Sequence, residues 1–298
     1  MSITSRRLEI LKAINRHSVL PSNFIYALDH GNPDRTKRNI QWLRERGYIY
    51  RPEQQDDSKM AFWANGIYAL TDKGRDVLLE YGNPYIGWTN RQFWHQLMIA
   101  EIVCSFELAC RERGFAFRTR RDIIGDKPLA LPCTVFLEGK PWGQFLYPDA
   151  IFGIDHLTFV VEADRDQEPV WRADFDASSY RRKITQYAEV FKNRTYQTEW
   201  GVQSLLVLNF TTSHTHCQNI LAKMQERMNA SPRSMLFRAV PSLASKERIP
   251  QPLLSVLDDP LERAGHPPLI VSKEVSDGQQ TYADSRANRS QGAHRRRA

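Results

Sequence analysis

Three carboxylate side chains lie close together in the segment QFLYPDAIFGIDHLTFVVEADRD, residues 144–166. Asp149 lies in one hydrophobic run, and Glu162 and Asp164 lie at the end of the next. Residues two apart on a strand point to the same face, and carboxylates beside an apolar sheet are costly unless a cation offsets them. Two interpretations remain open: a site for a divalent cation such as Mg²⁺, which prefers carboxylate oxygens, or an ion-pair network. The arginines nearby in sequence are Arg165, Arg181 and Arg182.

Hydrophobic patterning predicts the elements that position these carboxylates. The runs Phe145–Ile154 and Leu157–Ala163 are separated by two residues, which predicts a β-hairpin. A helix is expected at about 174–194, because its apolar residues recur at helical spacing. The other elements expected in this part are a helix at 90–113, a strand at Phe115–Arg121, an irregular segment at 122–142, a strand at Gln203–Phe210, a helix at 215–229 and a strand at Met235–Val240.

The N-terminal residues predict a separate set of elements. Helices are expected at 4–17, from Pro21-Ser22 to His30, and from Asn32-Pro33 to Arg46, where an N-cap residue precedes a proline at the first helical position. Strands are expected at Tyr48–Arg51 and Phe62–Leu70 around a polar tip at 52–61, and Thr71 is expected to cap a last helix. Three helices, a hairpin and a closing helix is the element order of a winged helix-turn-helix. The stretch GYIYRP…GIYALTDKGRDVL also resembles the wing of many bacterial winged-helix repressors and plasmid proteins.

The third of these helices is expected to present a cationic outer face. Residues 32–51 contain six Lys or Arg and two acidic residues. DNA binding needs cations for phosphates and a helix that fits the major groove, so we expect double-stranded DNA as the partner, through phosphate contacts more than base reading. The alternative is a solvated helix face or a protein-interaction module. The residues expected to bind DNA are Arg35, Lys37, Arg38, Gln41, Arg44 and Arg51.

A resemblance to known proteins joins the two halves. The order helix, three strands, helix, strand, with PD in one strand and ExD in the next, resembles the PD-(D/E)XK nuclease-like fold. A winged helix followed by YPDAIFGI…FVVEADRD…YRRKITQYAEVF resembles, more specifically, the replication-relaxation proteins of plasmids and integrated elements, over roughly residues 5–210. This resemblance implies DNA processing linked to plasmid replication or mobilisation, with replication or mobilisation proteins as further partners.

The resemblance also implies roles for individual residues. In the nuclease-like fold Asp149 and Glu162 would hold Mg²⁺, with the backbone carbonyl of Ala163 as a third contact. The lysine of the motif should stand where this chain has Asp164, which is a departure. Some nuclease relatives carry that lysine on the following helix, where Lys183 is the candidate. The implied catalytic set is therefore Asp149, Glu162, Asp164 and Lys183, and Glu101 is a further carboxylate.

Charge distribution and cysteine content limit the possible classes of protein. Residues 286–298 contain five arginines and no acidic residue, so they account for most of the net charge of +7. No segment approaches the roughly 20 apolar residues of a membrane helix. The four cysteines form no CxxC pair, which fits a reducing cytoplasm. The stretch His214-Thr215-His216-Cys217 lacks a second half for zinc and is interpreted as a loop and helix cap, and His95 as a packing histidine.

Together these features predict an α+β chain with four parts. They are a winged-helix DNA-binding domain at 1–82, a linker at 83–89, a PD-(D/E)XK nuclease-like α/β domain at 90–271 and a disordered basic tail at 272–298. Three functions remain open. The first is a DNA-binding accessory or regulatory protein with a degenerate nuclease-like domain, the second is a Mg²⁺-dependent endonuclease or nickase, and the third is a transcriptional repressor with a ligand-sensing or dimerising domain. The displaced lysine favours the first over the second, and the carboxylate cluster disfavours the third.

Overall fold

Four helices and a small antiparallel sheet form the N-terminal unit. The computed structural model describes residues 3–55, 66–85, 93–137, 140–143, 145–166, 168–172, 179–227, 233–245 and 249–278. The helices are α1 (Ser5–His17), α2 (Ser22–Asp29), α3 (Pro33–Glu45) and α4 (Asp72–Glu80), and the strands are β1 (Val19–Pro21), β2 (Ile49–Tyr50) and β3 (Ile67–Leu70) in the order β1-β3-β2.

Local capping explains why these helices begin where they do. The Asn32 side chain accepts a hydrogen bond from the amide of Asp34, and Pro33 follows it at the first helical position. Thr71 caps α4 in the same way by accepting from the amide of Gly74. The predicted helices are therefore confirmed. The strand predicted over Phe62–Leu70 is described from Ile67 onward, and most of the predicted tip at 52–61 lies outside the described residues.

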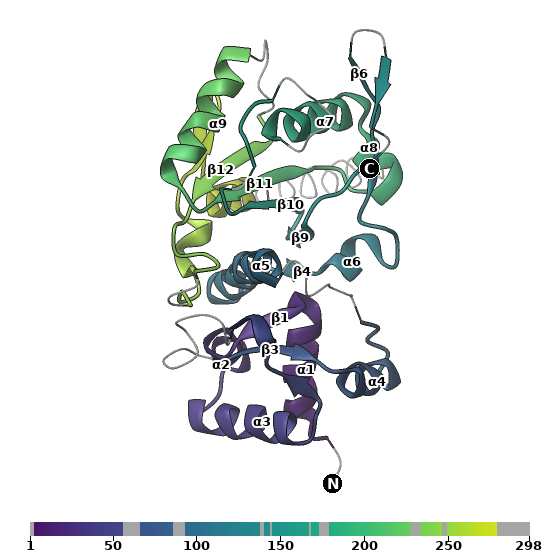
Figure 1. Cartoon of the computed structure of the whole chain (residues 1–298), viewed down its shortest axis with the longest axis vertical. Coiled ribbons are helices and arrows are strands. Elements are labelled where there is room, and N and C mark those ends of the chain that lie inside the picture. Colours follow the sequence, from purple (N-terminus) through teal and green to yellow (C-terminus); the bar gives the residue numbers. More distant parts are fainter. Residues whose placement is uncertain are drawn as a thin grey trace, which may run out of the picture.

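A mixed seven-stranded sheet forms the second unit (Figure 1). The strand order is β14-β13-β12-β11-β10-β9-β4, and β10, β11 and β12 run parallel. Its strands are β4 (Phe117–Arg118), β9 (Ala150–Ile154), β10 (Leu157–Asp164), β11 (Leu206–Thr211), β12 (Met235–Ala239), β13 (Leu261–Arg263) and β14 (His266–Leu269). Its helices are α5 (Phe93–Arg113), α6 (Arg120–Ile124), α7 (Tyr180–Asn193), α8 (Thr195–Trp200) and α9 (His214–Arg227), with a 3-10 turn, η4, at Leu254–Leu257. The mixed α/β class is thus confirmed.

Three predicted elements of this unit need correction. The run Phe145–Ile154 is not one strand: β8 (Phe145–Leu146) pairs with β5 (Leu131–Pro132), and β9 begins only at Ala150. The strand expected up to Arg121 ends at Arg118, because Thr119 caps α6. The segment expected to be irregular also contains the hairpin of β6 (Val135–Leu137) and β7 (Lys140–Trp142).

Residues 271–278 form a helix where the disordered tail was expected to begin, and residues 279–298 lie outside the described part.

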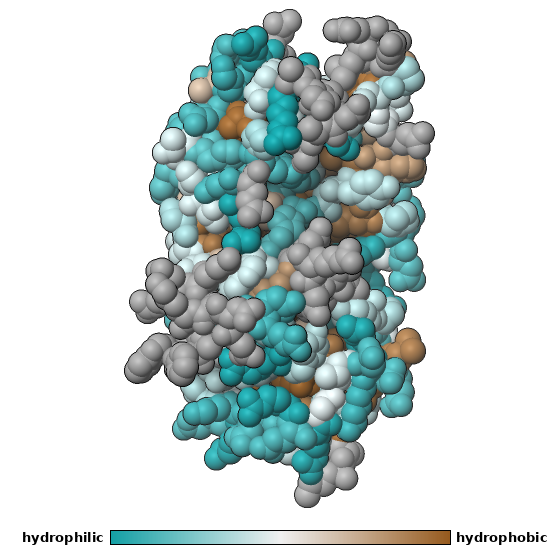
Figure 2. Space-filling model, viewed as in Figure 1, coloured by the Kyte–Doolittle hydropathy of each residue, from teal (hydrophilic) through white to brown (hydrophobic). Residues whose placement is uncertain are grey.

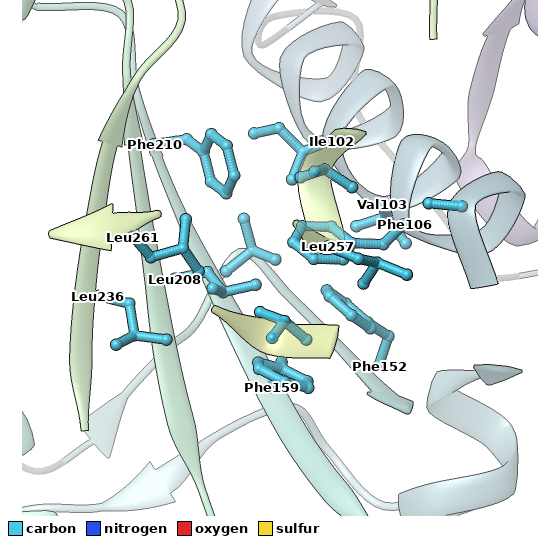
Figure 3. Close-up of a cluster of buried hydrophobic side chains, with 14 of the residues drawn as sticks. Ile102, Val103, Phe106, Phe152, Phe159, Leu208, Phe210, Leu236, Leu257 and Leu261 are labelled. Carbon is cyan, nitrogen blue, oxygen red and sulfur yellow. The ribbon is translucent and has the colours of Figure 1, made fainter. Parts of the chain in front are cut away.

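Alternation along β10 divides the sheet into two faces. Phe159 and Val161 belong to the core between the sheet and α5, where Phe106 packs against Phe152 and Phe159 (Figure 3). Val160 belongs to the opposite core, beneath α7 and α9. Because side chains alternate along a strand, Glu162 and Asp164 share the face of Val160 and point toward the side of α7.

Helix α5 belongs to both units. Leu97 and Leu108 pack in the core of the N-terminal unit, whereas Ile102 and Phe106 pack against the sheet. In Figure 1 the helix runs between the small sheet and the large one. The linker expected at 83–89 is therefore followed by a helix that closes both hydrophobic cores.

A buried carboxylate on α5 adds a polar connection to α1. Glu107 accepts hydrogen bonds from the side chains of Arg16 and His17, both at 2.9 Å, and from Arg111. Burial alone would raise the pKa of Glu107, but His17 and the two arginines hold it well below its usual range. This ionised group therefore stays charged and holds the two units together at neutral pH.

Two further observations bear on the class of protein. Within the described ranges, no helix has both the length and the apolar character needed to cross a membrane. All four cysteines are free and buried. Burial raises the pKa of Cys104 well above the value of an ordinary thiol.

Glu101 gives a test of this core. It is fully buried on α5, its Oε2 accepts from the amide of Ala244 at 2.7 Å, and burial raises its pKa to about 8. An unfolded chain loses this proton near pH 4.3, so the folded state binds one more proton between roughly pH 4.5 and 8 and its stability falls as pH rises through that window. We predict that Glu101→Gln flattens this decline and is more stable than the wild type at pH 8. Urea unfolding from pH 5 to 8 measures it, with the exposed Glu112→Gln as control; parallel curves for Glu101→Gln and wild type would disprove the assignment.

Candidate functional site

Three of the four predicted catalytic residues, Asp149, Glu162 and Lys183, come together where β9 begins beside the end of β10. The amide of Asp149 donates to the carbonyl of Val161 at 3.0 Å, which brings Asp149 beside Glu162. From α7, the Nζ of Lys183 lies 3.1 Å from Glu162 Oε2 and 3.1 Å from Glu168 Oε2. The lysine of the helix therefore lies next to the carboxylates, as the resemblance implied.

Two neighbours orient the carboxylate of Asp149. Its Oδ2 accepts from the amide of Ala163 at 2.8 Å, and its Oδ1 lies 2.9 Å from His95 Nε2. His95 was expected to be a packing residue, but it is the hydrogen-bonding partner of Asp149. Burial lowers the pKa of His95, and the hydrogen bond and charge of Asp149 more than compensate, so the pKa is raised overall. The raised pKa favours a protonated His95 that donates a hydrogen bond to Asp149.

Glu162 is the most buried member of the site, with 1% of its surface exposed. The Tyr187 hydroxyl donates to its Oε1 at 2.5 Å, and Lys183 contacts its other oxygen. Burial raises the pKa of Glu162 to about 7, and Lys183 opposes that effect. Burial would likewise lower the pKa of Lys183, but the charges of Glu162, Asp149 and Glu168 raise it. The positive charge of Lys183 therefore favours the ionised form of Glu162.

The donor set fits a divalent cation. Asp149 and Glu162 supply oxygen atoms, which hard cations such as Mg²⁺ prefer. The side chain of Asp149 is 20% exposed, so an ion can reach it from solvent, whereas that of Glu162 is 2% exposed. A second positive charge beside Asp149 would favour ionised Glu162 in the same way as Lys183 does. The residues present are thus compatible with a metal at this position.

The remaining candidates lie elsewhere. Asp164 pairs with His216 Nε2 at 2.8 Å, and the ring of His216 packs against the ring of Tyr180. Glu101 faces Ala244, and neither Asp149 nor Glu162 contributes to its pKa shift. The arginines considered for an ion-pair network pack on aromatic rings: Arg165 on Trp94, Arg181 on Trp171 and Arg182 on Trp142. Lys183 is a cation that contacts Glu162.

A second candidate site covers the outer face of α3. Thr36, Ile40 and Leu43 are buried, and the predicted DNA-binding residues of this helix are all exposed, with Arg51 half-buried on the chain after β2. Figure 2 shows mainly hydrophilic residues over this end of the molecule, where Figure 1 places α3. Four of the predicted residues line one open groove between α2, α3 and β3, together with Tyr26 and Tyr68: Lys37, Gln41, Arg44 and Arg51.

Sequence reasoning missed a second group of cations beside α3. The guanidinium groups of Arg7 and Arg46 lie 3.8 and 4.5 Å from the centre of the Trp42 ring, which stacks on Tyr48. Lys73 Nζ lies 4.4 Å from the Tyr48 ring. These cations come from α1, α4 and the turn after α3, so spacing along the sequence could not reveal them.

A cleft at the junction of the two units is also basic. Lys12 and Arg16 of α1 line it together with Arg120 and Arg121 of α6. It adjoins a cavity that shares Arg16 and Arg120 and extends to Asp149. Arg16 and Arg120 therefore line both cavities, and the second cavity reaches Asp149.

The elements and sites define a mixed α/β protein with a cationic helical unit and a carboxylate–lysine cluster. Residues 11–206, about two thirds of the chain, match the model of the family described as replication-relaxation. The chain belongs to this family, which confirms the resemblance stated from the sequence. Comparisons with curated proteins and with solved structures found no match. Family membership suggests a role in replication or relaxation of plasmid or mobile-element DNA.

The Lys183–Glu162 contact generates a stability prediction. Lys183→Met removes the cation and leaves a buried carboxylate without its partner, which costs about 3–5 kcal/mol in comparable buried pairs. The pKa of Glu162, already raised to about 7, should rise further in this variant. The loss of folding stability relative to the wild type should therefore be largest above pH 7. It should be smaller at pH 5, where Glu162 holds a proton in both proteins. Urea unfolding at pH 5 and 8 measures it. Lys192→Met, on the exposed side of the same helix, is the control, and equal stability of the two variants at pH 8 would refute the contact.

Proposed function

We propose that this protein is a DNA-binding protein that acts on plasmid or mobile-element DNA through an N-terminal winged helix-turn-helix. The element order α1-β1-α2-α3-β2-β3-α4 supports a winged helix, with α3 as the helix that enters the major groove. Double-stranded DNA is the partner, and replication or mobilisation proteins are further partners. Family membership supports the DNA substrate class.

One observation carries this proposal: the cationic side chains of α3 project outward while the inner face of the same helix is buried in its own core. Lys37, Gln41 and Arg44 are three and four residues apart, so they project from one side and line one groove with Arg51. Neutralising duplex phosphates with such side chains releases counterions, and this release supplies most of the affinity at low salt.

DNA binding through α3 should depend on salt concentration. Lys37→Ala and Arg44→Ala should each weaken duplex affinity and reduce the slope of log Kd against log salt by about 1, because each removes one phosphate contact. Fluorescence anisotropy of a labelled duplex between 50 and 300 mM salt measures this slope. Lys192→Ala, an exposed lysine of α7, is the control. Slopes that are identical for all three variants and the wild type would exclude α3 from the interface.

A second candidate function is Mg²⁺-dependent cleavage of a DNA strand by a PD-(D/E)XK-like domain. The observation that favours it is the position of Lys183, which restores the lysine that Asp164 replaces in the motif. Bound Mg²⁺ would activate water and neutralise charge on the phosphate. Asp149 and Glu162 would hold it, Lys183 would stabilise developing negative charge, and His95 would orient Asp149. The basic cleft that leads to Asp149 would hold the strand.

Plasmid nicking distinguishes the two candidates. Pure protein is incubated with supercoiled plasmid and Mg²⁺ or Mn²⁺, beside Asp149→Ala and Glu162→Ala. Nicking by the wild type that is lost in both variants supports the enzyme. DNA binding without nicking supports an accessory protein whose carboxylate site is not used for cleavage. The control is Asp122→Ala, an exposed capping residue of α6, which should nick like the wild type.

A further inference from the structure

Asp164, Asp166 and His216 meet at one end of the large sheet. Asp164 ends β10, and His216 lies in the first turn of α9, which follows the parallel strand β11. One ligand atom from each of the three residues lies within 4.8 Å of the other two. Open α/β sheets bind ligands at the carboxyl ends of their parallel strands, and this cluster occupies that position.

The spacing of these atoms suits one ion. His216 Nε2 lies 2.8 Å from Asp164 Oδ2. Ligands about 2.0–2.2 Å from a shared metal are themselves roughly 3 Å apart, so this pair already has the required separation. Asp166 is exposed, and its Oδ2 accepts from the Thr212 hydroxyl at 2.9 Å. Its ligand oxygen lies within 4.8 Å of the ligand atoms of the other two residues.

The hydroxyl of Tyr180 is a second, independent indication. This residue is fully buried, and its oxygen has no hydrogen-bonding partner among the described atoms. Its ring meets the ring of His216 edge-on at 5.7 Å. Buried hydroxyl groups are normally hydrogen-bonded, so an unmet donor on a ring that packs against His216 calls for a polar group at this position.

We propose that Asp164, Asp166 and His216 bind a divalent transition-metal ion, with the Tyr180 hydroxyl bonded to a water on that ion. An imidazole together with carboxylates favours Zn²⁺ or Mn²⁺ over Mg²⁺ or Ca²⁺, which prefer oxygen ligands alone. The site is separate from the pair Asp149 and Glu162 and does not depend on DNA cleavage. It gives a role to the aspartate that replaces the lysine of the nuclease motif.

Calorimetric titration of the intact, untagged chain with Zn²⁺ and with Mn²⁺, after treatment with a chelator, tests the proposal. We expect saturable binding of one equivalent. His216→Ala and Asp166→Asn should each weaken binding at least about tenfold, because the first removes an imidazole ligand and the second removes the charge of a carboxylate ligand. His214→Ala is the matched control, since that histidine is exposed and begins the same helix, and its affinity should equal that of the wild type.

Thermal melting separates a metal site from a structural pair. In the absence of metal, His216→Ala loses the hydrogen bond to Asp164, and its melting temperature should fall. Asp166 is exposed, so Asp166→Asn should melt at the temperature of the wild type without metal. Added Zn²⁺ should raise the melting temperature of the wild type and of His214→Ala by more than that of Asp166→Asn at the same Zn²⁺ concentration. The proposal is overturned by the absence of saturable binding to the wild type, by equal affinity in His216→Ala and His214→Ala, or by binding that is lost in Asp149→Asn but kept in His216→Ala.

Discussion

The fold depends on the burial of α5 on opposite sides by two different cores. A helix with one apolar stripe can cover one core, but this helix is apolar nearly all round, with Leu97 and Leu108 serving the N-terminal unit and Ile102 and Phe106 serving the sheet. Neither core closes without it. A chain built in this way does not behave as two modules on a flexible linker, because separating the units would expose one face of α5 to water.

This constraint links the two candidate sites physically. The cationic face of α3 lies on the far side of the N-terminal core from α5, and Asp149 accepts a hydrogen bond from His95 in the first turn of α5. The contacts of buried Glu107 with Arg16 and His17 hold α1 to the same helix. Duplex DNA on α3 and a strand in the basic cleft at the junction would therefore be held at a fixed separation.

Local signals made much of the fold predictable. Asn32-Pro33 and Thr71 begin helices through contacts with their immediate neighbours, so the sequence suffices to locate them. The hydrophobic run Leu157–Ala163 made β10 predictable, and the resemblance to nuclease-like proteins pointed to Lys183. The strand β1 was missed because three residues carry too little periodicity to be distinguished from a turn.

Tertiary contacts account for what the sequence could not give. The pairing of His95 with Asp149 joins residues 54 positions apart, and that of His216 with Asp164 joins residues 52 apart. His95 was interpreted as a packing residue, and the stretch His214-Thr215-His216-Cys217 lacks a second half for zinc, so it was interpreted as a loop and helix cap. The break after Phe145–Leu146 likewise results from pairing with Leu131–Pro132, which no local pattern encodes.

The claim that matters most is that duplex DNA lies against α3 and the groove beside it. Photocrosslinking of the intact chain to a bromodeoxyuridine-substituted duplex, followed by mass spectrometry of the peptides, tests it directly. Aromatic side chains react well in such experiments, and Tyr26 and Tyr68 line the groove with Lys37 and Arg44. The account predicts crosslinks at these tyrosines or elsewhere within residues 26–51. Crosslinks confined to α7, α9 or the outer strands of the large sheet would contradict it.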